Sequence, residues 1–240
     1  MAFQPSENDI VSCHTLLQAL SDPVRNDHRS ALESLGFFIS SVGSVSDNVI
    51  LNQTHNFITI ILYIFVNGSS LQIDLSIRQL AGLIIKNYII NIITKLPVEI
   101  IHQIKGQVLN ALGDNETDIR STAGTIIGRI ADAYIINEWI DLIPPLIQML
   151  DFNDNIAMLD GALVAIKRMA EDSANKISMS IDQIPSLQQL LPKLISLFHF
   201  TSGDNIFVRK RALECKFFFS ISHLLTQSNF LKYFSEVLIL

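Results

Sequence analysis

Residues 114–172 read DNETDIRSTAGTIIGRIADAYIINEWIDLIPPLIQMLDFNDNIAMLDGALVAIKRMAED, and this stretch decides the fold. It predicts a helix, a short break, a second helix kinked or restarted at Pro144-Pro145, a turn and a third helix. The first and third helices carry the same apolar stripe, at steps of four, three and four residues, which is one face of an α-helix. The stripe consists of Ile119, Ala123, Ile126 and Ile130 in the first helix and of Met158, Ala162, Ala165 and Met169 in the third.

The same stripe occurs twice more, once on each side of this stretch. Alanine takes its second place in all four helices, and the alanines are 42, 39 and 50 residues apart. These spacings are close to the period of two-helix solenoid repeats, where a small residue lets neighbouring helices approach. The alternative is a helical bundle in which the alanines coincide by chance. The two outer stripes are Ile77, Ala81, Ile84 and Tyr88, and Val208, Ala212, Cys215 and Phe219.

The composition indicates a chain with a large core. It has 240 residues, of which 49% are hydrophobic and only 17% are charged. Either most of the chain is buried, or the neighbours that would cover its apolar surface are missing. A net charge of −6 argues against non-specific binding to nucleic acid and permits basic partners. Two cysteines are too few for a disulfide framework, which favours a reducing compartment, and the chain opens with no secretory leader.

The mean hydropathy is positive, at +0.36, so insertion into a membrane has to be considered. The longest apolar run, 57–66, is interrupted by Thr59. It spans roughly ten residues, whereas a bilayer-crossing helix needs about 20. We therefore expect no membrane insertion, and a membrane-associated helical protein remains an alternative.

Helix and turn signals extend the pattern to the rest of the chain. The break at Ser21-Asp22-Pro23 predicts a second helix to about Leu35 with proline at its first position. Residues 36–54 show no clear period and are treated as an irregular insertion, with a loop or an added turn of helix as the alternatives. Asn67-Gly68-Ser69-Ser70 predicts a turn, and Pro97 can open a helix. The predicted helices outside the opening stretch cover 6–20, 55–66, 71–93, 97–112, 187–200, 205–223 and the start of another at 229–240.

We find no pattern of an enzyme. The six histidines are scattered, and none forms a metal-ligand pair at helical spacing with a nearby acid. Neither a phosphate-binding glycine-rich loop nor a serine elbow is present in the sequence. We therefore expect no catalytic residue, no metal and no cofactor.

Four blocks in a fixed order resemble the amino-terminal HEAT repeats of the importin-β (karyopherin-β) family, and within it the transportin branch. They are RQLAGLIIKN (78–87), DIRSTAGTIIGRIA (118–131), EWIDLIPPLIQMLD (138–151) and GALVAIKRMAEDSA (161–174). The resemblance covers about residues 1–35 and 50–225, and it departs at 36–50 and at the early carboxyl terminus. It predicts an all-α HEAT-repeat solenoid over 1–240, with about five helical hairpins and the start of another.

The resemblance also implies a function in protein import into the nucleus. Family members hold the small GTPase Ran in its GTP form on an arch of their first repeats, bind nucleoporins, and shuttle between cytoplasm and nucleus. The cargo site and the acidic loop that couples Ran to cargo release belong to later repeats and would be missing here. The apolar end at 229–240 lacks the polar outer face expected of a last repeat, so the chain is expected to be the amino-terminal part of a longer protein or a truncated gene product. The alternative is a HEAT scaffold of another complex, such as a phosphatase regulatory subunit.

The side of each striped helix opposite the stripe is the candidate binding line. Three glycines lie on it, Gly82, Gly124 and Gly128. Glycine inside a helix costs about 1 kcal/mol relative to alanine, so the line indicates close approach by Ran or by the adjacent repeat. The residues expected to contact the GTPase are Lys86, Asn87, Asp160, Lys167, Glu171 and Asp172.

Three arginines beside the stripes have a different expected role. Arg78, Arg120 and Arg209 are predicted to bridge adjacent repeats by pairing with acids such as Asp74 or Asp118. We therefore treat them as structural.

Overall fold

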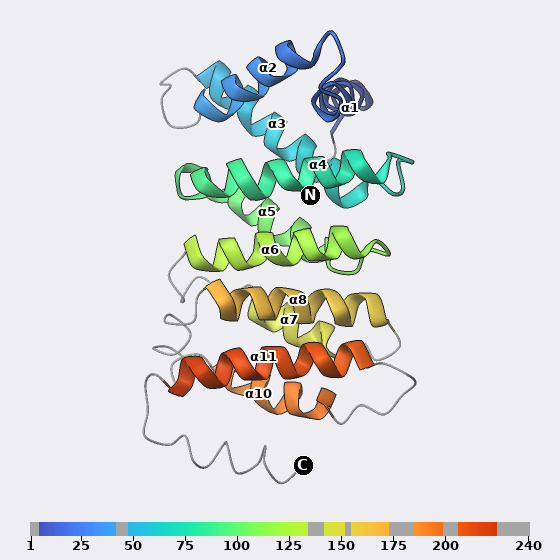
Figure 1. Cartoon of the computed structure of the whole chain (residues 1–240). Helices are drawn as coiled ribbons and strands as arrows, with labels where there is room; N and C mark the ends of the chain where they lie inside the picture. Colours follow the sequence, from blue (N-terminus) through green and yellow to red (C-terminus); the bar gives the residue numbers. More distant parts are fainter. Residues whose placement is uncertain are drawn as a thin grey trace. The chain divides into compact units, whose positions relative to one another are not determined.

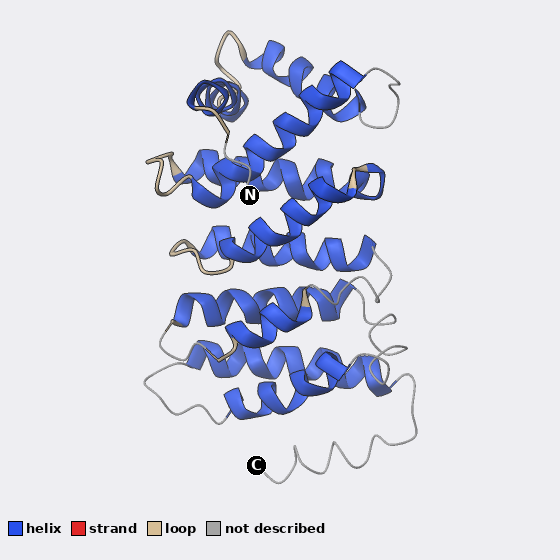
Figure 2. Cartoon of the chain, turned by 180° about the vertical axis from the view of Figure 1, so that it is seen from behind, coloured by secondary structure: helices blue, strands red, loops and turns tan. Residues whose placement is uncertain are grey.

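The computed structural model describes residues 5–41, 48–133, 142–151, 155–172, 185–198 and 206–224. Every regular element in these ranges is helical, as Figure 2 shows. The chain divides into two compact units, Met1–Ile126 and Ile127–Leu240. Within the described ranges the helices follow one another as five hairpins, which confirms the predicted all-α fold.

The first unit contains two and a half hairpins. In Figure 1, α4 and the beginning of α6 lie side by side, with α3 and α5 behind them. The helix α4 continues without a break as a π-helix and then a 3₁₀-helix. The elements are α1 (Glu7–Ser21), α2 (His28–Ser41), α3 (Asn48–Asn67), α4 (Leu75–Ile84), the π-helix (Ile85–Ile89), the 3₁₀-helix (Ile90–Lys95), α5 (Val98–Ala111) and α6 (Thr117–Ala133), which crosses into the second unit.

The second unit continues from Ile127 with the end of α6 and two further hairpins. Pro144 and Pro145 lie in the first turn of α7, where a missing N–H leaves no hydrogen bond unmade, so the helix starts there. The helices α8 and α11 lie side by side in front of α7 and α10 (Figure 1). The elements are α7 (Ile143–Met149), α8 (Ile156–Asp172), α10 (Pro185–Phe198) and α11 (Ile206–Leu224). The part of the predicted second helix before residue 142 and the helix start at 229–240 lie outside the described residues.

Local signals fix several helix boundaries. Ser6 caps α1, since its Oγ accepts a hydrogen bond from the backbone N of Asp9 at 3.2 Å. The predicted turn after α3 forms, with the backbone N of Ser70 donating to the carbonyl of Asn67 at 3.0 Å. Pro97 immediately precedes α5 as its N-cap residue.

The apolar stripes form the core. The four stripe residues of α6 have no exposed surface, at 0% each. In α8 the stripe is buried from Ala162 onward and half-buried at Met158, and in α11 it is buried as far as Cys215. Burial also raises the pKa of the Cys13 and Cys215 thiols to about 12, so both side chains behave as small apolar residues at neutral pH.

Only the first three of the four predicted stripe residues of α4 lie in the core. Ile77, Ala81 and Ile84 are buried, but Tyr88 is 45% exposed. The π-helix that follows Ile84 has a longer turn than an α-helix, so the 3.6-residue period no longer applies beyond that point. Ile85, at 1% exposed, takes the core position instead.

Two further predictions are wrong at helix boundaries. Pro23 does not open α2; it lies in a turn in which the backbone N of Val24 donates to Asp22 Oδ1 at 2.9 Å, and α2 begins at His28. The expected irregular insertion at 36–54 is also wrong at both ends, because α2 extends to Ser41 and α3 begins at Asn48. Serines and glycine interrupt the apolar pattern there, but nothing in those ranges blocks a helix as proline would.

Candidate functional site

In the first unit, the candidate binding line of α4 runs along the edge that meets α6. Gln79 Nε2 donates a hydrogen bond to Asp118 Oδ2 at 2.7 Å. One turn further on, a Cβ added to Gly82 would lie 2.8 Å from Thr122 Cγ2 and 2.6 Å from Phe65 Cε2. The absence of a side chain at Gly82 therefore lets α4 pack closely against its neighbours.

In the second unit, the line of α8 meets α11 in the same way. Asp160 Oδ1 forms an ion pair with Arg211 Nε at 2.5 Å, and Lys167 Nζ donates to Glu214 Oε2 at 2.9 Å. The Cys215 thiol, next to Glu214 on α11, donates at 3.3 Å to the carbonyl of Leu163, which lies between Asp160 and Lys167 on α8. The order of the partners along both helices means that α8 and α11 run in the same direction.

The glycines of this line are explained by neighbouring helices. A Cβ added to Gly128 would lie 2.8 Å from Arg168 Cβ and 3.1 Å from the Arg168 backbone carbon. Gly82 and Gly128 thus both border a helix of their own unit, and Gly124 is buried. Of the two explanations left open by the sequence, close approach by the adjacent repeat is the one that holds at Gly82 and Gly128.

Four of the six candidate contact residues gather on α8. Beside its bond to Glu214, Lys167 Nζ lies 3.8 Å from Glu171 Oε1, and Arg168 Nη1 lies 2.9 Å from Glu171 Oε2. Asp172 closes the helix, and burial raises the pKa of its carboxyl group while Arg129 and Arg168 act in the opposite direction. Asp160, Lys167, Glu171 and Asp172 therefore form a partly exposed band that carries both signs of charge.

The other two candidate residues lie in the first unit, on the π-helix. Lys86 is half-buried and Asn87 is exposed. The backbone carbonyl of Asn87 accepts a hydrogen bond from Asn91 Nδ2 at 2.6 Å. The six predicted residues thus form two groups, one in each unit.

Arg211 and Glu214 complete the charged band, and the sequence analysis did not select them. Both lie on α11 in the turn around the stripe residue Ala212, opposite charges on α8. Charges of opposite sign at matching places of two striped helices were the signal that could have identified them.

Replacing Glu214 by glutamine should have a small effect that depends on pH. The hydrogen bond from Lys167 lowers the pKa of the Glu214 carboxyl group below its usual value, and burial opposes this shift. A depressed carboxyl pKa stabilises the fold above the unfolded-state value of about 4.3, and this contribution disappears as the pH falls through the folded-state pKa. Because both side chains are partly solvated, we expect Glu214→Gln to lower the free energy of unfolding by less than about 1 kcal/mol at pH 7.

Urea unfolding between pH 7 and pH 3 measures this difference. The curves of the wild type and Glu214→Gln should converge toward pH 3. A difference that stays constant over this range would mean that the Lys167–Glu214 pair is not the cause.

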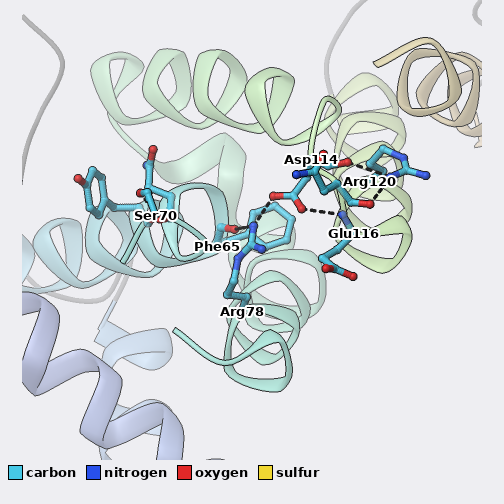
Figure 3. Close-up of polar contacts among 9 residues, drawn as sticks. Phe65, Ser70, Arg78, Asp114, Glu116 and Arg120 are labelled. Carbon is cyan, nitrogen blue, oxygen red and sulfur yellow. Dashed lines mark hydrogen bonds and ion pairs between the residues drawn. The ribbon is translucent and has the colours of Figure 1, made fainter. Parts of the chain in front are cut away.

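The arginines of the first unit hold the loops between helices, as Figure 3 shows. Arg78 is buried, donates to the carbonyl of Phe65 at 3.2 Å and forms an ion pair with Asp114. The predicted partners Asp74 and Asp118 are therefore wrong for Arg78: its side chain reaches the loop between α5 and α6. Arg120 Nη1 donates to the backbone carbonyl of the same Asp114 at 2.8 Å, a bond within its own repeat. The predicted bridge between adjacent repeats is therefore found at Arg78, and this bond of Arg120 holds its own loop. Arg209 is half-buried.

The described ranges contain no group of three or more histidine, cysteine, aspartate or glutamate side chains placed to hold a metal ion. No helix in the same ranges combines the length and the apolar character needed to cross a membrane.

The repeated hairpins, the buried alanine-bearing stripes and the polar bonds between successive second helices define a HEAT-repeat protein. Comparison with known proteins gives the particular family. A profile described as "Importin-beta N-terminal domain" matches residues 50–114. The chain is 33% identical over 168 residues to "Transportin" of Dictyostelium discoideum, covering 70% of this chain and 17% of that protein.

Two other relatives agree with this result. "Transportin-1" of Homo sapiens is 31% identical over 172 residues, which cover 72% of this chain and 18% of that protein. "Importin subunit beta-2" of Schizosaccharomyces pombe is 26% identical over 211 residues, covering 87% of this chain and 22% of that protein. The chain belongs to the importin-β family, on its transportin branch. It spans about a fifth of the length of these relatives.

Proposed function

We propose that this chain is the Ran-binding amino-terminal part of a nuclear import receptor, and that it prefers Ran in its GTP form. The observation that carries the proposal is the similarity to transportins over 70% of the chain. The corresponding activity is recognition of another protein and involves no catalysis. In this proposal the cargo site lies in repeats beyond this chain, the receptor contacts nucleoporins, and it moves between cytoplasm and nucleus.

The proposed contact residues are Lys86 and Asn87 in the first unit and the charged band of α8 in the second. Asp160, Lys167 and Glu171 form ion pairs with side chains on α8 and α11, which restrict their movement before a partner arrives. Binding then costs less conformational entropy than it would with free side chains. A fixed pattern of both signs also favours one partner surface over others, because like charges brought together are penalised.

Lys86 offers a sharper mutational test than the band. Reversing a charge at Asp160 or Glu171 would also break ion pairs between or within helices. Among the residues that the structure describes, Lys86 has no ion pair that would complicate the same change. We expect Lys86→Glu to weaken binding of Ran-GTP about tenfold, mainly through slower association at low salt. Biolayer interferometry at two salt concentrations measures both rates.

The matched control is Lys95→Glu, which makes the same change at an exposed position at the end of the 3₁₀-helix. It should leave the affinity within about twofold of the wild type, as expected for a charge outside the contact area. Equal weakening by both variants would indicate a general effect of net charge and would contradict a specific role of Lys86.

A further inference from the structure

Asn67 and Gly68 form the one asparagine–glycine pair in the sequence. Asparagine followed by glycine is especially prone to deamidation, because glycine has no side chain that would hinder attack by its own backbone nitrogen. Asn67 is the last residue of α3, and Gly68 begins the turn that leads to α4. The turn between these helices therefore contains a reactive sequence.

Deamidation at this pair needs only a base and water. The backbone N of Gly68 gives up its proton to a solvent base and forms a bond to Asn67 Cγ, while the bond between Cγ and Nδ2 breaks and ammonia leaves. Water then opens the resulting succinimide ring to give aspartate or isoaspartate. Each event consumes a water molecule and releases ammonia, and no oxidant or cofactor takes part.

The native structure keeps the two reacting groups apart. The backbone N of Gly68 donates a hydrogen bond to the carbonyl of Ile64 at 2.9 Å, and the carbonyl of Gly68 accepts one from the backbone N of Ile73 at 2.9 Å. Asn67 Nδ2 donates to the carbonyl of Tyr63 at 3.3 Å, so the side-chain amide points back along α3. Attack therefore requires Asn67 to leave its helical backbone conformation and these bonds to break.

The side chain of Arg78 covers the turn. A Cβ added to Gly68 would lie 2.7 Å from Arg78 Cγ and 2.8 Å from Arg78 Cδ, so the apolar part of this arginine lies directly on Gly68, which is buried. The guanidinium group is anchored by the carbonyl of Phe65 and by Asp114, as Figure 3 shows. Opening the turn requires Arg78 to move, and the buried ion pair opposes that movement.

We infer that Asn67 is a deamidation site that the native first unit keeps closed and that reacts when the turn after α3 opens. The inference is independent of the proposed function. Aspartate at this position places a negative charge at the carboxyl end of α3, where the helix dipole disfavours it. Isoaspartate adds a carbon atom to the main chain and displaces Gly68 from its bonds to Ile64 and Ile73. Deamidation thus makes a transient opening of the first unit irreversible.

The rates of deamidation in the folded and the unfolded chain test the inference directly. The wild-type chain is incubated at the same mildly alkaline pH and temperature with and without urea, and the peptide that contains Asn67 is followed by mass spectrometry. We expect the rate to be at least about tenfold lower in the folded chain, because the reaction waits for a local opening. Equal rates with and without urea, or no deamidation of Asn67 in urea, would overturn the inference.

Asp114→Asn tests the part that Arg78 plays. The change releases the guanidinium group, so deamidation of Asn67 in the folded chain should become at least about threefold faster, and hydrogen exchange of the Gly68 N–H should accelerate by the same factor, since both need the same opening. The control Glu33→Gln, in an exposed ion pair on α2, should leave both rates within about twofold of the wild type.

An unchanged deamidation rate in a folded Asp114→Asn, or faster exchange without faster deamidation, would overturn the inference. Circular dichroism shows whether the variant is folded. If Asp114→Asn does not fold, the comparison of the wild type with and without urea decides.

Discussion

Asp114→Asn should lower the free energy of unfolding of the first unit by about 3–5 kcal/mol, because it leaves the charge of Arg78 buried without its counter-ion. The Arg78 side chain is 3% exposed and that of Asp114 is 10% exposed, so water cannot replace the lost partner. Asparagine keeps Oδ1, which accepts a hydrogen bond from the backbone N of Glu116 at 2.9 Å in the wild type. The loop should therefore keep its turn, and the change isolates the charge.

The double variant Arg78→Met with Asp114→Asn should recover much of the loss, because a buried ion pair replaced by uncharged groups of similar size is often nearly neutral. The control is the solvent-exposed ion pair between Arg29 and Glu33 on α2, whose side chains are 92% and 71% exposed. Glu33→Gln should change stability by less than about 0.5 kcal/mol. Urea unfolding followed by circular dichroism compares all three, and a loss at Asp114→Asn no larger than at Glu33→Gln would contradict a buried pair.

Gly82→Val should destabilise the first unit by about 3 kcal/mol, at the upper end of what overpacking a core costs. A Cβ at this position already lies 2.6 Å from Phe65 Cε2, and Phe65 is fully buried and has little room to move. Valine adds two further carbons in the same space. Gly82→Ala should also destabilise, although alanine favours a helix by about 1 kcal/mol over glycine.

Gly106 on α5 provides the matched control for Gly82→Ala. It is exposed in the interior of a helix of the same unit, and a Cβ there would meet no atom within 4 Å. Gly106→Ala should therefore stabilise the chain by up to about 1 kcal/mol. Opposite signs for the same substitution at the two sites are the expected result, and equal signs would contradict the close packing of α4 against its neighbours.

The stripe residues allowed most of the fold to be predicted from the sequence. Ile119 and Ala123 could be placed in the core because helical periodicity relates their spacing directly to one face. The positions of the helix ends were less accessible. Pro23 has the φ angle that suits a first helical turn, but the side chain of Asp22 instead holds a turn there, and such competition between local signals is not readable from residue types alone.

Tyr88 was wrongly predicted to lie in the core, because helical periodicity cannot account for a change of helix type. A pattern with a constant period assumes that every turn is α-helical, and the π-helix at Ile85–Ile89 breaks that assumption. The run of isoleucines around it is compatible with either register, since each register buries apolar side chains. Only packing against the rest of the unit selects Ile85 for the core.

The candidate binding line was predicted to face away from the stripe. Its residues instead occupy the edge between adjacent second helices, as Asp160 and Lys167 do beside α11. A helix in a layer has neighbours on its flanks as well as beneath it, so residues opposite the core stripe can still be half-buried. The partner Asp114 was missed because it lies in a loop, where no period marks it.

The preference of this chain for one nucleotide state of Ran is the most direct test of the proposed function. The immobilised chain is incubated with purified Ran loaded either with a non-hydrolysable GTP analogue or with GDP, and bound Ran is quantified. We expect retention of the GTP form and little or none of the GDP form. Equal retention of both forms, or retention of neither, would contradict the account of this chain as a Ran-binding part of a nuclear import receptor.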